Sequence, residues 1–466
     1  MKFKIYKVNF MKKIYMKIYS KNPYTGESIG EYETLSSDEL KDRLRNASMA
    51  ANSWKEVALD VRCELIRKAG QVLRNNIDRY ARMITDEMGK PISESRSEIE
   101  KCAWVCDYYA ENAKVFLQDK NIETDATKSL VRYDPLGVVY AVMPWNFPFW
   151  QVFRFAAPTL TAGNAGLLKH ASNVTGCSQL IEEVFKEAGY PEAVFQSLIV
   201  DHELSEEIIS SQYVQAVTLT GSEGAGSIVA SQAGKQLKKT VLELGGSNSF
   251  VVCEDADLEK VVQTAVQARM QNCGQSCIAA KRFILIGSMY EEFIPRFINE
   301  LKKLKTGNPL LDETDIGPMA REDLAETLEK QMNKSIEKGA VILHGGKRKE
   351  CFFDPTVIAE VQPGMPAFDE ETFGPLASMI KATSLEHALE LSEMSKFGLG
   401  VTICTQDENV AMDFAGRVSD GACFVNELVK SDPRLPFGGT KKSGYGRELS
   451  KDGIMEFVNR KTVYFK

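Results

Sequence analysis

The sequence predicts an α/β protein in which a mostly helical lead-in is followed by two successive parallel-sheet modules. Up to about residue 115, polar and apolar residues alternate at helical spacing, as in residues 36–54. From residue 136 onward, short β-rich runs alternate with helical segments, which is the pattern of parallel βαβ units. The length of 466 residues allows about three domains at roughly 150 residues per domain.

The first module begins with strands that we predict at residues 137–143 and 164–170. A helix is expected over residues 175–189, because Gly189 and Pro191 end its apolar periodicity. Further strands and helices should then alternate through residues 195–200, 202–211, 214–220, 223–237 and 239–245. The uncharged stretch 135–153 contains three prolines, so we predict buried loop and strand there and no membrane-spanning helix.

The second module restarts the alternation after Gly246. Strands are expected at residues 248–253 and 282–287, and helices at residues 257–270 and 290–304. The final segment, residues 455–466, predicts a terminal strand whose partner lies outside its own module. At the other end, residues 1–15 are basic and aromatic and are followed by an alternative start, so we expect them to be an extension that adds nothing to the fold.

The composition argues against several classes of binding protein and favours a reducing compartment. Lys and Arg total 57 against 64 Asp and Glu, so no basic field favours nucleic acid or an anionic membrane. Ten cysteines at irregular spacing, without a secretory signal, favour free thiols in a reducing cytoplasm. There is no CxxC pair and there are only four histidines, so we expect no metal site.

The densest cluster of chemically special residues is NCGQSCIAA, residues 272–280. A nucleophilic thiol needs space for a substrate carbonyl and a nearby backbone N–H for the oxyanion, and the small neighbours of Cys277 permit both. The alternative is a buried structural cysteine beside a turn, since free cysteine is commonly buried. Cys273 lies four residues earlier. A reversible disulfide between the two would need their Cα atoms within about 7 Å.

Two polar residues are candidates to assist such a thiol. Glu243 ends an apolar strand ahead of paired glycines, which is typical of a general base with a raised pKa. The alternative is a strand-end glutamate in solvent. Asn146, in MPWNFP, is held among prolines and aromatic residues and has a rigid amide that can donate to an oxyanion. The alternative is a turn in which this side chain caps the backbone.

Three further segments are candidates for a ligand-binding site. TGSEGAG, residues 220–226, follows a strand and opens a helix, where glycines let a phosphate approach backbone N–H groups. It matches neither a Walker loop nor G-x-G-x-x-G, so a plain turn is the alternative. Lys169 ends another strand and reaches either a ligand or solvent. EETFGP sets Glu371 and Phe373 on a stiff loop or a surface turn.

Taken together and in this order, MPWNFP, TGSEGAG, LELGGS, GQSC, EETFGP and PFGGTKKSGYGRE resemble the motifs of the aldehyde dehydrogenase superfamily. LKHASNVTGC, VLELGGSNS and KKSGYGRELS are most similar to the short bacterial succinate-semialdehyde dehydrogenases. The resemblance runs from about residue 22 to the end of the chain. It implies an aldehyde-dehydrogenase-like fold with a Rossmann-type cofactor-binding domain (16–116 and 136–244), an α/β catalytic domain (245–440) and a small bridging β-sheet (117–135 and 454–466) that builds a homodimer or homotetramer.

The resemblance also implies roles for the matching residues. Cys277 would attack an aldehyde to give a thiohemiacetal, whose oxyanion rests on Asn146 and on the backbone N–H of Cys277. Hydride would pass to the nicotinamide of NADP or NAD, and Glu243 would activate the water that hydrolyses the resulting thioester. The residues implied for cofactor binding are Trp145, Lys169, Ser172, Gly221, Ser222, Leu244, Glu371 and Phe373.

Two positions bear on specificity. Many NAD-preferring relatives have Glu where this chain has Ser172, and that carboxylate would repel a 2′-phosphate. Ser172 removes the repulsion while Lys169 remains as a cation, so we expect NADP to be accepted and even preferred. For the substrate, Arg154 matches an arginine that clamps succinate semialdehyde in relatives, and one guanidinium can bind a carboxylate bidentately. We therefore expect a small aldehyde with a distal carboxylate, bound by Arg154 together with Gln271, Ser431 and Arg434.

Several alternatives stay open. The substrate of such a dehydrogenase could be another small aldehyde. A CoA-acylating enzyme would discharge the thioester on a thiol, whereas Glu243 favours water. A cysteine hydrolase would need a histidine partner, and none of the four histidines lies in a site-like cluster. The non-enzymatic alternative is a catalytically silent binding or structural protein on the same fold.

Overall fold

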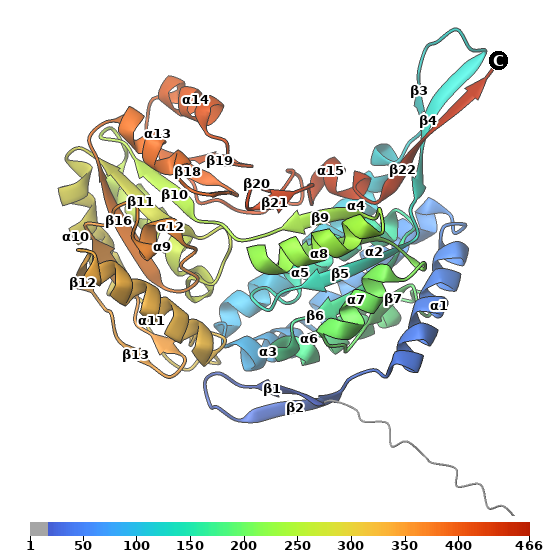
Figure 1. The fold of residues 1–466 in the computed structure, drawn as a ribbon, viewed down its shortest axis with the longest axis horizontal. Helices are drawn as coiled ribbons and strands as arrows, with labels where there is room; N and C mark the ends of the chain where they lie inside the picture. The colour runs from blue at the N-terminus through green and yellow to red at the C-terminus, as the bar shows by residue number, and fades with distance from the viewer. Residues whose placement is uncertain (1–16) are drawn as a thin grey trace, which may run out of the picture.

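The computed structural model describes residues 17–466, in which helices join two large sheets and a small one (Figure 1). The extension expected at residues 1–15 lies outside the described residues. A hairpin of β1 (Lys17–Lys21) and β2 (Ser28–Glu33) opens the described chain. The expected helical lead-in follows as α1 (Ser37–Trp54), α2 (Leu59–Asn75), α3 (Ile77–Met88) and α4 (Ile92–Phe116). Ser36 caps α1 by accepting the backbone N–H of Glu39, which fixes where that helix begins.

The first module is a six-stranded sheet in the order β21-β9-β8-β5-β6-β7. Its strands are β5 (Val138–Met143), β6 (Ala165–His170), β7 (Phe195–Ser197), β8 (Val214–Thr220), β9 (Lys239–Glu243) and β21 (Gly444–Tyr445). All neighbours are parallel except β21, which runs antiparallel along β9 at the edge. The connecting helices are α6 (Thr175–Glu187), α7 (His202–Ser210) and α8 (Glu223–Lys235). The sequence-based predictions for this module are confirmed, although β7 is shorter than the expected 195–200.

Helix α5 (Trp150–Thr161) departs from the prediction, which placed buried loop and strand over residues 135–153. All 12 residues of this helix are buried. Arg154 is its only charged residue, and Pro148 and Pro158 lie just before and within it, so the segment lacks the charged face and the proline-free run that are typical of a surface helix. The prediction of burial is confirmed, and the prediction of loop is wrong from Trp150 onward.

The second module is a seven-stranded sheet in the order β12-β15-β16-β11-β10-β18-β19. Its strands are β10 (Asn248–Val252), β11 (Ala280–Ile286), β12 (Val341–His344), β15 (Thr356–Ala359), β16 (Leu376–Ala382), β18 (Val401–Cys404) and β19 (Cys423–Val425). Its helices are α9 (Leu258–Met270), α10 (Met289–Leu301), α11 (Glu322–Glu337), α12 (Pro366–Asp369), α13 (Leu385–Glu393) and α14 (Glu408–Arg417). Two short ribbons accompany the modules, β13 (Arg348–Lys349) with β14 (Phe352–Phe353) and β17 (Phe397–Gly398) with β20 (Thr440–Lys441).

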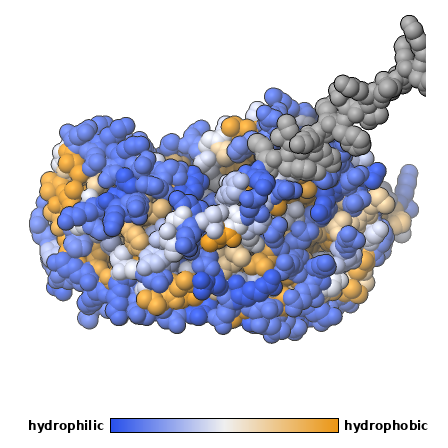
Figure 2. Space-filling view, turned by 90° about the horizontal axis from the view of Figure 1, so that it is seen from below, coloured by the Kyte–Doolittle hydropathy of each residue, from blue (hydrophilic) through white to orange (hydrophobic). Residues whose placement is uncertain are grey.

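The end of the chain forms a separate three-stranded sheet. After α15 (Ser450–Met455), β22 (Val458–Phe465) runs antiparallel to β4 (Lys128–Pro135), which also pairs with β3 (Lys120–Asn121). The predicted need of the terminal strand for a partner outside its module is confirmed. The sheet projects from the body as an arm (Figure 1). Hydrophilic residues cover most of the face drawn in Figure 2, and apolar residues appear there only in scattered groups. Among residues 17–466, no helix is both long and apolar enough to cross a bilayer.

Candidate active site

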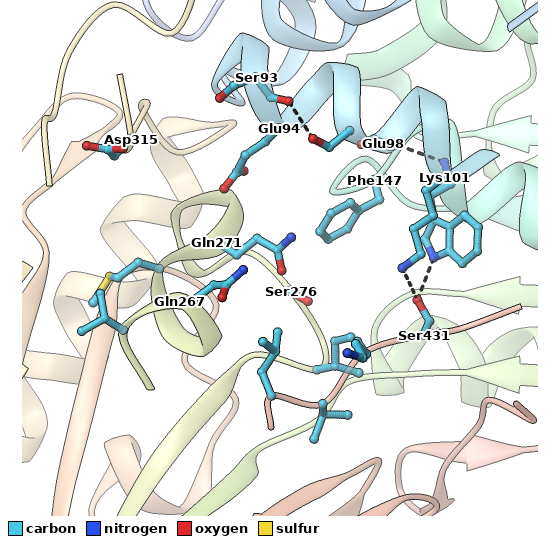
Figure 3. A pocket seen from close by; sticks show the side chains of 18 of the residues that line it. Ser93, Glu94, Glu98, Lys101, Phe147, Gln267, Gln271, Ser276, Asp315 and Ser431 are labelled. Carbon is cyan, nitrogen blue, oxygen red and sulfur yellow. Dashed lines mark hydrogen bonds between the residues drawn. The ribbon is translucent and has the colours of Figure 1, made fainter. Parts of the chain in front are cut away.

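A cavity of about 820 Å³ has the thiol-bearing turn in its wall. Helices α4 and α5 contribute one side, and the end of α9 together with residues 427–431 contributes another. Figure 3 shows Gln267 of α9 and Gln271, directly after that helix, reaching into this space, with Phe147 and Lys101 facing it from the opposite side. The cavity therefore lies between elements of both modules.

Three left-handed residues shape the turn that carries Cys277. Asn272 and Cys273 each have a φ of 54°, and Gly274 has a φ of 70°. A Cβ at Gly274 would collide with the carbonyl oxygen of Gly374, so this close approach requires glycine. Cys273 is buried. Both Cys273 and Cys277 are free thiols. The local strain is thus concentrated directly beside the candidate nucleophile.

The environment of Cys277 acts on both its sulfur and its backbone. Burial raises the pKa of the thiol to about 11, while the charges of Arg154 and Lys281 oppose this rise. The Nζ of Lys281 donates to the Cys277 carbonyl at 2.8 Å. The backbone N–H of Cys277 has no hydrogen-bond partner within residues 17–466. That free donor lies next to the sulfur, where an oxyanion would form.

Asn146 is joined to the same turn. Its side chain is buried, and Nδ2 donates to the Gln275 carbonyl at 3.1 Å. Its own backbone carbonyl accepts from Asn272 Nδ2 at 2.8 Å. An amide nitrogen carries two hydrogens, so one remains for a ligand.

Glu243, the last residue of β9, is 2% exposed. Neither of its carboxyl oxygens has a hydrogen-bond partner in the described part of the chain. Burial and the neighbouring Glu448 raise the pKa of Glu243 well above its usual range, against the opposing charges of Arg154 and Arg447. A buried, unpartnered carboxyl of this kind is suited to take up a proton during a reaction.

The ETFG loop meets the nucleophile turn through Glu371. Its Oε1 accepts the backbone N–H of Gly246 at 3.0 Å and lies 3.4 Å from the Nζ of Lys281. Phe373, two residues further, makes an edge-on contact with Trp145, the ring centroids being 5.7 Å apart. The structure therefore brings together four segments that are far apart in the sequence, those around Trp145, Gly246, Lys281 and Glu371.

A second group of predicted residues lies at the carboxyl edge of the first sheet. Lys169, in β6, is largely buried, which lowers its pKa, and it has no hydrogen bond or ion pair among the described residues. Ser172 is exposed in the 3-10 turn η1 (Ser172–Val174). Ser222 caps α8 and follows Gly221, which leaves the helix N-terminus open to an anion. Leu244 is buried close to the start of α8. An unpaired cation, an exposed hydroxyl and a helix N-terminus at one sheet edge fit a phosphorylated dinucleotide.

The predicted substrate residues do not all reach the cavity. Gln271 and Ser431 line it, as does Arg154. However, Arg154 is buried in an ion pair with Glu448, so its guanidinium already has a carboxylate partner. Arg434 lies outside the cavity lining, where its exposed guanidinium binds Asp432 at 2.7 Å.

Sequence reasoning missed two lysines that the structure places at this site. Lys101 faces the cavity from α4, and Lys281 links the Cys277 carbonyl to Glu371. In the sequence, Lys101 belongs to a helix rich in charged residues, which is the usual appearance of a solvated face. Lys281 lies four residues after Cys277. This short spacing is the only feature of the sequence that could have indicated a role for Lys281 at the thiol.

Comparison with known proteins adds independent information. The model of the "Aldehyde dehydrogenase family" matches residues 11–463. A Synechocystis protein named "Probable succinate-semialdehyde dehydrogenase (NADP(+))" is 46% identical over 452 residues, which cover 96% of this chain and 100% of that protein. The Escherichia coli "Succinate semialdehyde dehydrogenase (NAD(P)+) Sad" is 46% identical over 446 residues, covering 95% of this chain and 96% of that one.

Solved structures agree with this result. The succinic semialdehyde dehydrogenase of Streptococcus pyogenes, determined in complex with NADP+, superposes with a TM-score of 0.94 at 35% identity. The match covers 96% of this chain and 99% of the Streptococcus chain. The expected fold class, with a Rossmann-type sheet, a second α/β sheet and a small bridging sheet, is confirmed by this likeness.

Proposed function

We propose that this chain, which belongs to the aldehyde dehydrogenase family, oxidises succinate semialdehyde to succinate with NADP or NAD as the acceptor. The observation that carries this function is the surroundings of Cys277. A thiol faces the cavity beside its own unpaired N–H, and the Asn146 amide is anchored in the same turn. This is the arrangement that acyl chemistry on sulfur requires.

The first step is the attack of the Cys277 thiolate on the aldehyde carbon. The carbonyl oxygen becomes an oxyanion, which the backbone N–H of Cys277 and the second hydrogen of Asn146 Nδ2 stabilise. The cationic charges of Lys281 and Arg154 favour the thiolate before the attack. The bound nicotinamide supplies the hydride acceptor. Loss of the hydride and collapse of the oxyanion leave a thioester on the sulfur.

Hydrolysis of the thioester requires a base, and Glu243 is the candidate. Its raised pKa makes the carboxylate a stronger base than an exposed glutamate would be. As carboxylate, it takes a proton from water, the hydroxide adds to the thioester carbon, and the Cys277 thiolate leaves with release of the acid. Water is the acceptor in this scheme, so a free thiol such as CoA is not needed.

Cofactor recognition follows from the sheet edge described above. Ser222 and Gly221 would face the pyrophosphate at the start of α8, and Glu371 would hold the nicotinamide ribose. Trp145 and Phe373, already in contact, would lie near the nicotinamide. No carboxylate stands at position 172, and the unpaired Lys169 can attract a 2′-phosphate, which supports the use of NADP.

Location and assembly belong to the same proposal. All ten cysteines are free thiols, which supports a reducing compartment, and we place the enzyme in the cytoplasm. The arm of β3, β4 and β22 supports a homodimer or homotetramer in which copies of this chain meet through it. We also propose that residues 16–116 and 136–244 form the cofactor-binding domain, and that residues 245–440 form the catalytic domain, which carries the nucleophile.

Pre-steady-state release of reduced nicotinamide tests this function. With succinate semialdehyde and NADP, Glu243→Gln should give a burst of about one equivalent per subunit and then turn over at least about a hundredfold more slowly than the parent. Cys277→Ser should lose both burst and turnover, by at least about a thousandfold.

Cys273→Ala is the matched control, because it removes the neighbouring thiol and should leave the burst unchanged. A Cys277→Ser protein that oxidises succinate semialdehyde at the parental rate would contradict the mechanism. Equal burst and steady rates in Glu243→Gln would instead remove Glu243 as the base.

A further inference from the structure

Three side chains at one end of the cavity form a cluster of hydrogen-bond donors. The Nζ of Lys101, on α4, donates to Ser431 Oγ at 2.9 Å. The Nε1 of Trp150, on α5, donates to the same oxygen at 3.1 Å, and the ammonium lies 4.4 Å from the centroid of the Trp150 ring. Figure 3 shows both bonds converging on Ser431. A serine oxygen has two acceptor sites, so its own hydrogen is left to donate to a ligand.

The charges along the cavity single out Lys101. Three other cations line it, and each has a carboxylate partner: Arg154 with Glu448, Lys303 with Glu300, and Lys430 with Glu427. Within residues 17–466, Lys101 has no carboxylate within ion-pair distance. Its neighbour on the helix, Glu98, is engaged by Lys90 and by the backbone N–H groups of Phe149 and Trp150.

Lys101 is partly buried and has no carboxylate partner in the part of the chain that is described, so its ammonium is suited to receive an anion. This burial lowers the pKa of Lys101 to about 8. A carboxylate placed beside it would restore the missing partner and receive the Ser431 hydrogen as well. By contrast, the pairing of Arg154 with Glu448 leaves that guanidinium less free to serve as the anion site.

We propose that Lys101, together with the Ser431 hydroxyl, binds the distal carboxylate of the substrate and sets the preference for an ω-carboxylate aldehyde. The proposal rests on the proposed function, since it assigns the anchor for that reaction's substrate. Cys277 and Lys101 line the same cavity, and the proposal places the aldehyde carbonyl at the sulfur and the carboxylate at the ammonium.

The test compares succinate semialdehyde with butanal, which has the same chain length but no carboxylate. In Lys101→Met, kcat/KM for succinate semialdehyde should fall by about 10- to 100-fold, the loss expected for one charge-assisted hydrogen bond. The value for butanal should stay within about threefold. Lys101→Arg should recover part of the loss. Lys303→Met is the matched control, because it removes a paired cation from the same cavity and should leave the substrate ratio unchanged.

The outcomes separate the two proposals. Wild-type protein that does not prefer succinate semialdehyde over butanal contradicts the proposed function and this inference with it. A strong wild-type preference that survives in Lys101→Met overturns only the role of Lys101, and a loss of that preference supports it. Butanal oxidation reports whether the variant is folded.

Wild-type protein supplies a second measurement, should Lys101→Met not fold. The ratio of the two kcat/KM values should fall as the pH rises above about 8, because the ammonium loses its proton there. Arg154 on α5 disfavours the charge on Lys101, whereas Asp432 and Glu98 favour it. A ratio that is flat between about pH 7 and pH 10 would overturn the proposal.

Discussion

Cys277 is subject to two opposing influences. Burial raises the pKa of its thiol to about 11, which leaves little thiolate at neutral pH, and the cations Lys281 and Arg154 pull the pKa down. Lys281 is itself buried, and burial lowers its pKa to about 8. Its ammonium is therefore charged below about pH 8 and neutral above, so its support of the thiolate depends on pH.

Replacing Lys281 by methionine should slow alkylation of Cys277 in a pH-dependent manner. Loss of a nearby cation raises a thiol pKa by about one unit, so iodoacetamide should react about tenfold more slowly at about pH 7. Above about pH 9 the wild-type lysine is neutral too, and the two rates should converge. The alkylation rate is measured as a function of pH, and the loss of aldehyde oxidation activity serves as the readout of alkylation.

Lys281→Arg is the matched variant, because a guanidinium keeps its charge throughout this range. It should retain fast alkylation at high pH as well as at neutral pH. Identical pH profiles for wild type and Lys281→Met would show that the lysine only positions the turn through its bond to the Cys277 carbonyl.

The motifs of the sequence contain Cys277, Asn146, Glu243 and Glu371, and these side chains could be named because each lies within a short, distinctive segment. Lys101 could not be named as a site residue from the sequence, because its partner Ser431 is 330 residues away and only the fold brings the two together. The fold also decides the surroundings of Arg154. The resemblance implied that Arg154 clamps the substrate carboxylate, but tertiary packing sets its guanidinium against Glu448.

Helix α4 links the lead-in to the first module through a buried ion pair. Lys90, just before the helix, pairs with Glu98, and both side chains are almost wholly inaccessible to solvent. Glu98 also accepts the N–H groups of Phe149 and Trp150 at 2.8 and 2.9 Å, so one carboxylate satisfies the first donors of α5. The position of α5, which carries Trp150 and Arg154, therefore depends on this pair.

Lys90→Met should lower the free energy of unfolding by about 3–5 kcal/mol, because it leaves the Glu98 charge buried without its cation. Urea unfolding at fixed protein concentration measures the loss. The control is Lys41→Met, which removes an exposed pair with Asp38 and should change the free energy by less than about 1 kcal/mol. Equal effects of the two substitutions would contradict the structural role of the buried pair.

The strands and most helices of both modules could be predicted, because parallel βαβ units alternate two periodicities that are visible in the residues themselves. Helix α5 was not recognised, since it has a single charged residue and prolines both just before it and within it. The residues alone predicted only that β22 needs a partner, and the family resemblance implied that residues 117–135 supply it. The register of β22 with β4 joins residues more than 300 positions apart, such as Val458 with Pro135.

The arm formed by β3, β4 and β22 stands away from the two modules, and its surface includes apolar side chains. Tyr464 is 51% exposed and Phe465 is 50% exposed. Aromatic side chains exposed on a projecting sheet are suited to meet a second copy of the chain. This placement supports the proposed assembly through the arm.

The double variant Tyr464→Asp, Phe465→Asp should have a lower mass in solution than the parent, which we propose to be a homodimer or homotetramer, because it puts two charges on the apolar surface. Size-exclusion chromatography with light scattering measures the mass. Leu237→Asp, at a position 95% exposed after α8, is the control and should leave the mass unchanged. An unaltered mass for the double variant would place the contact between copies elsewhere.

Gly274 packs so closely against the Gly374 carbonyl that the conformations of two loops 100 positions apart depend on each other. A side chain at Gly274 would collide with the Gly374 carbonyl, whereas a side chain at Gly374 would meet Leu328 and Met319. A recombination crossover between them would join a turn from one parent to the facing loop of another. A substitution at Gly274 is therefore expected to require a shift of the loop that contains Gly374.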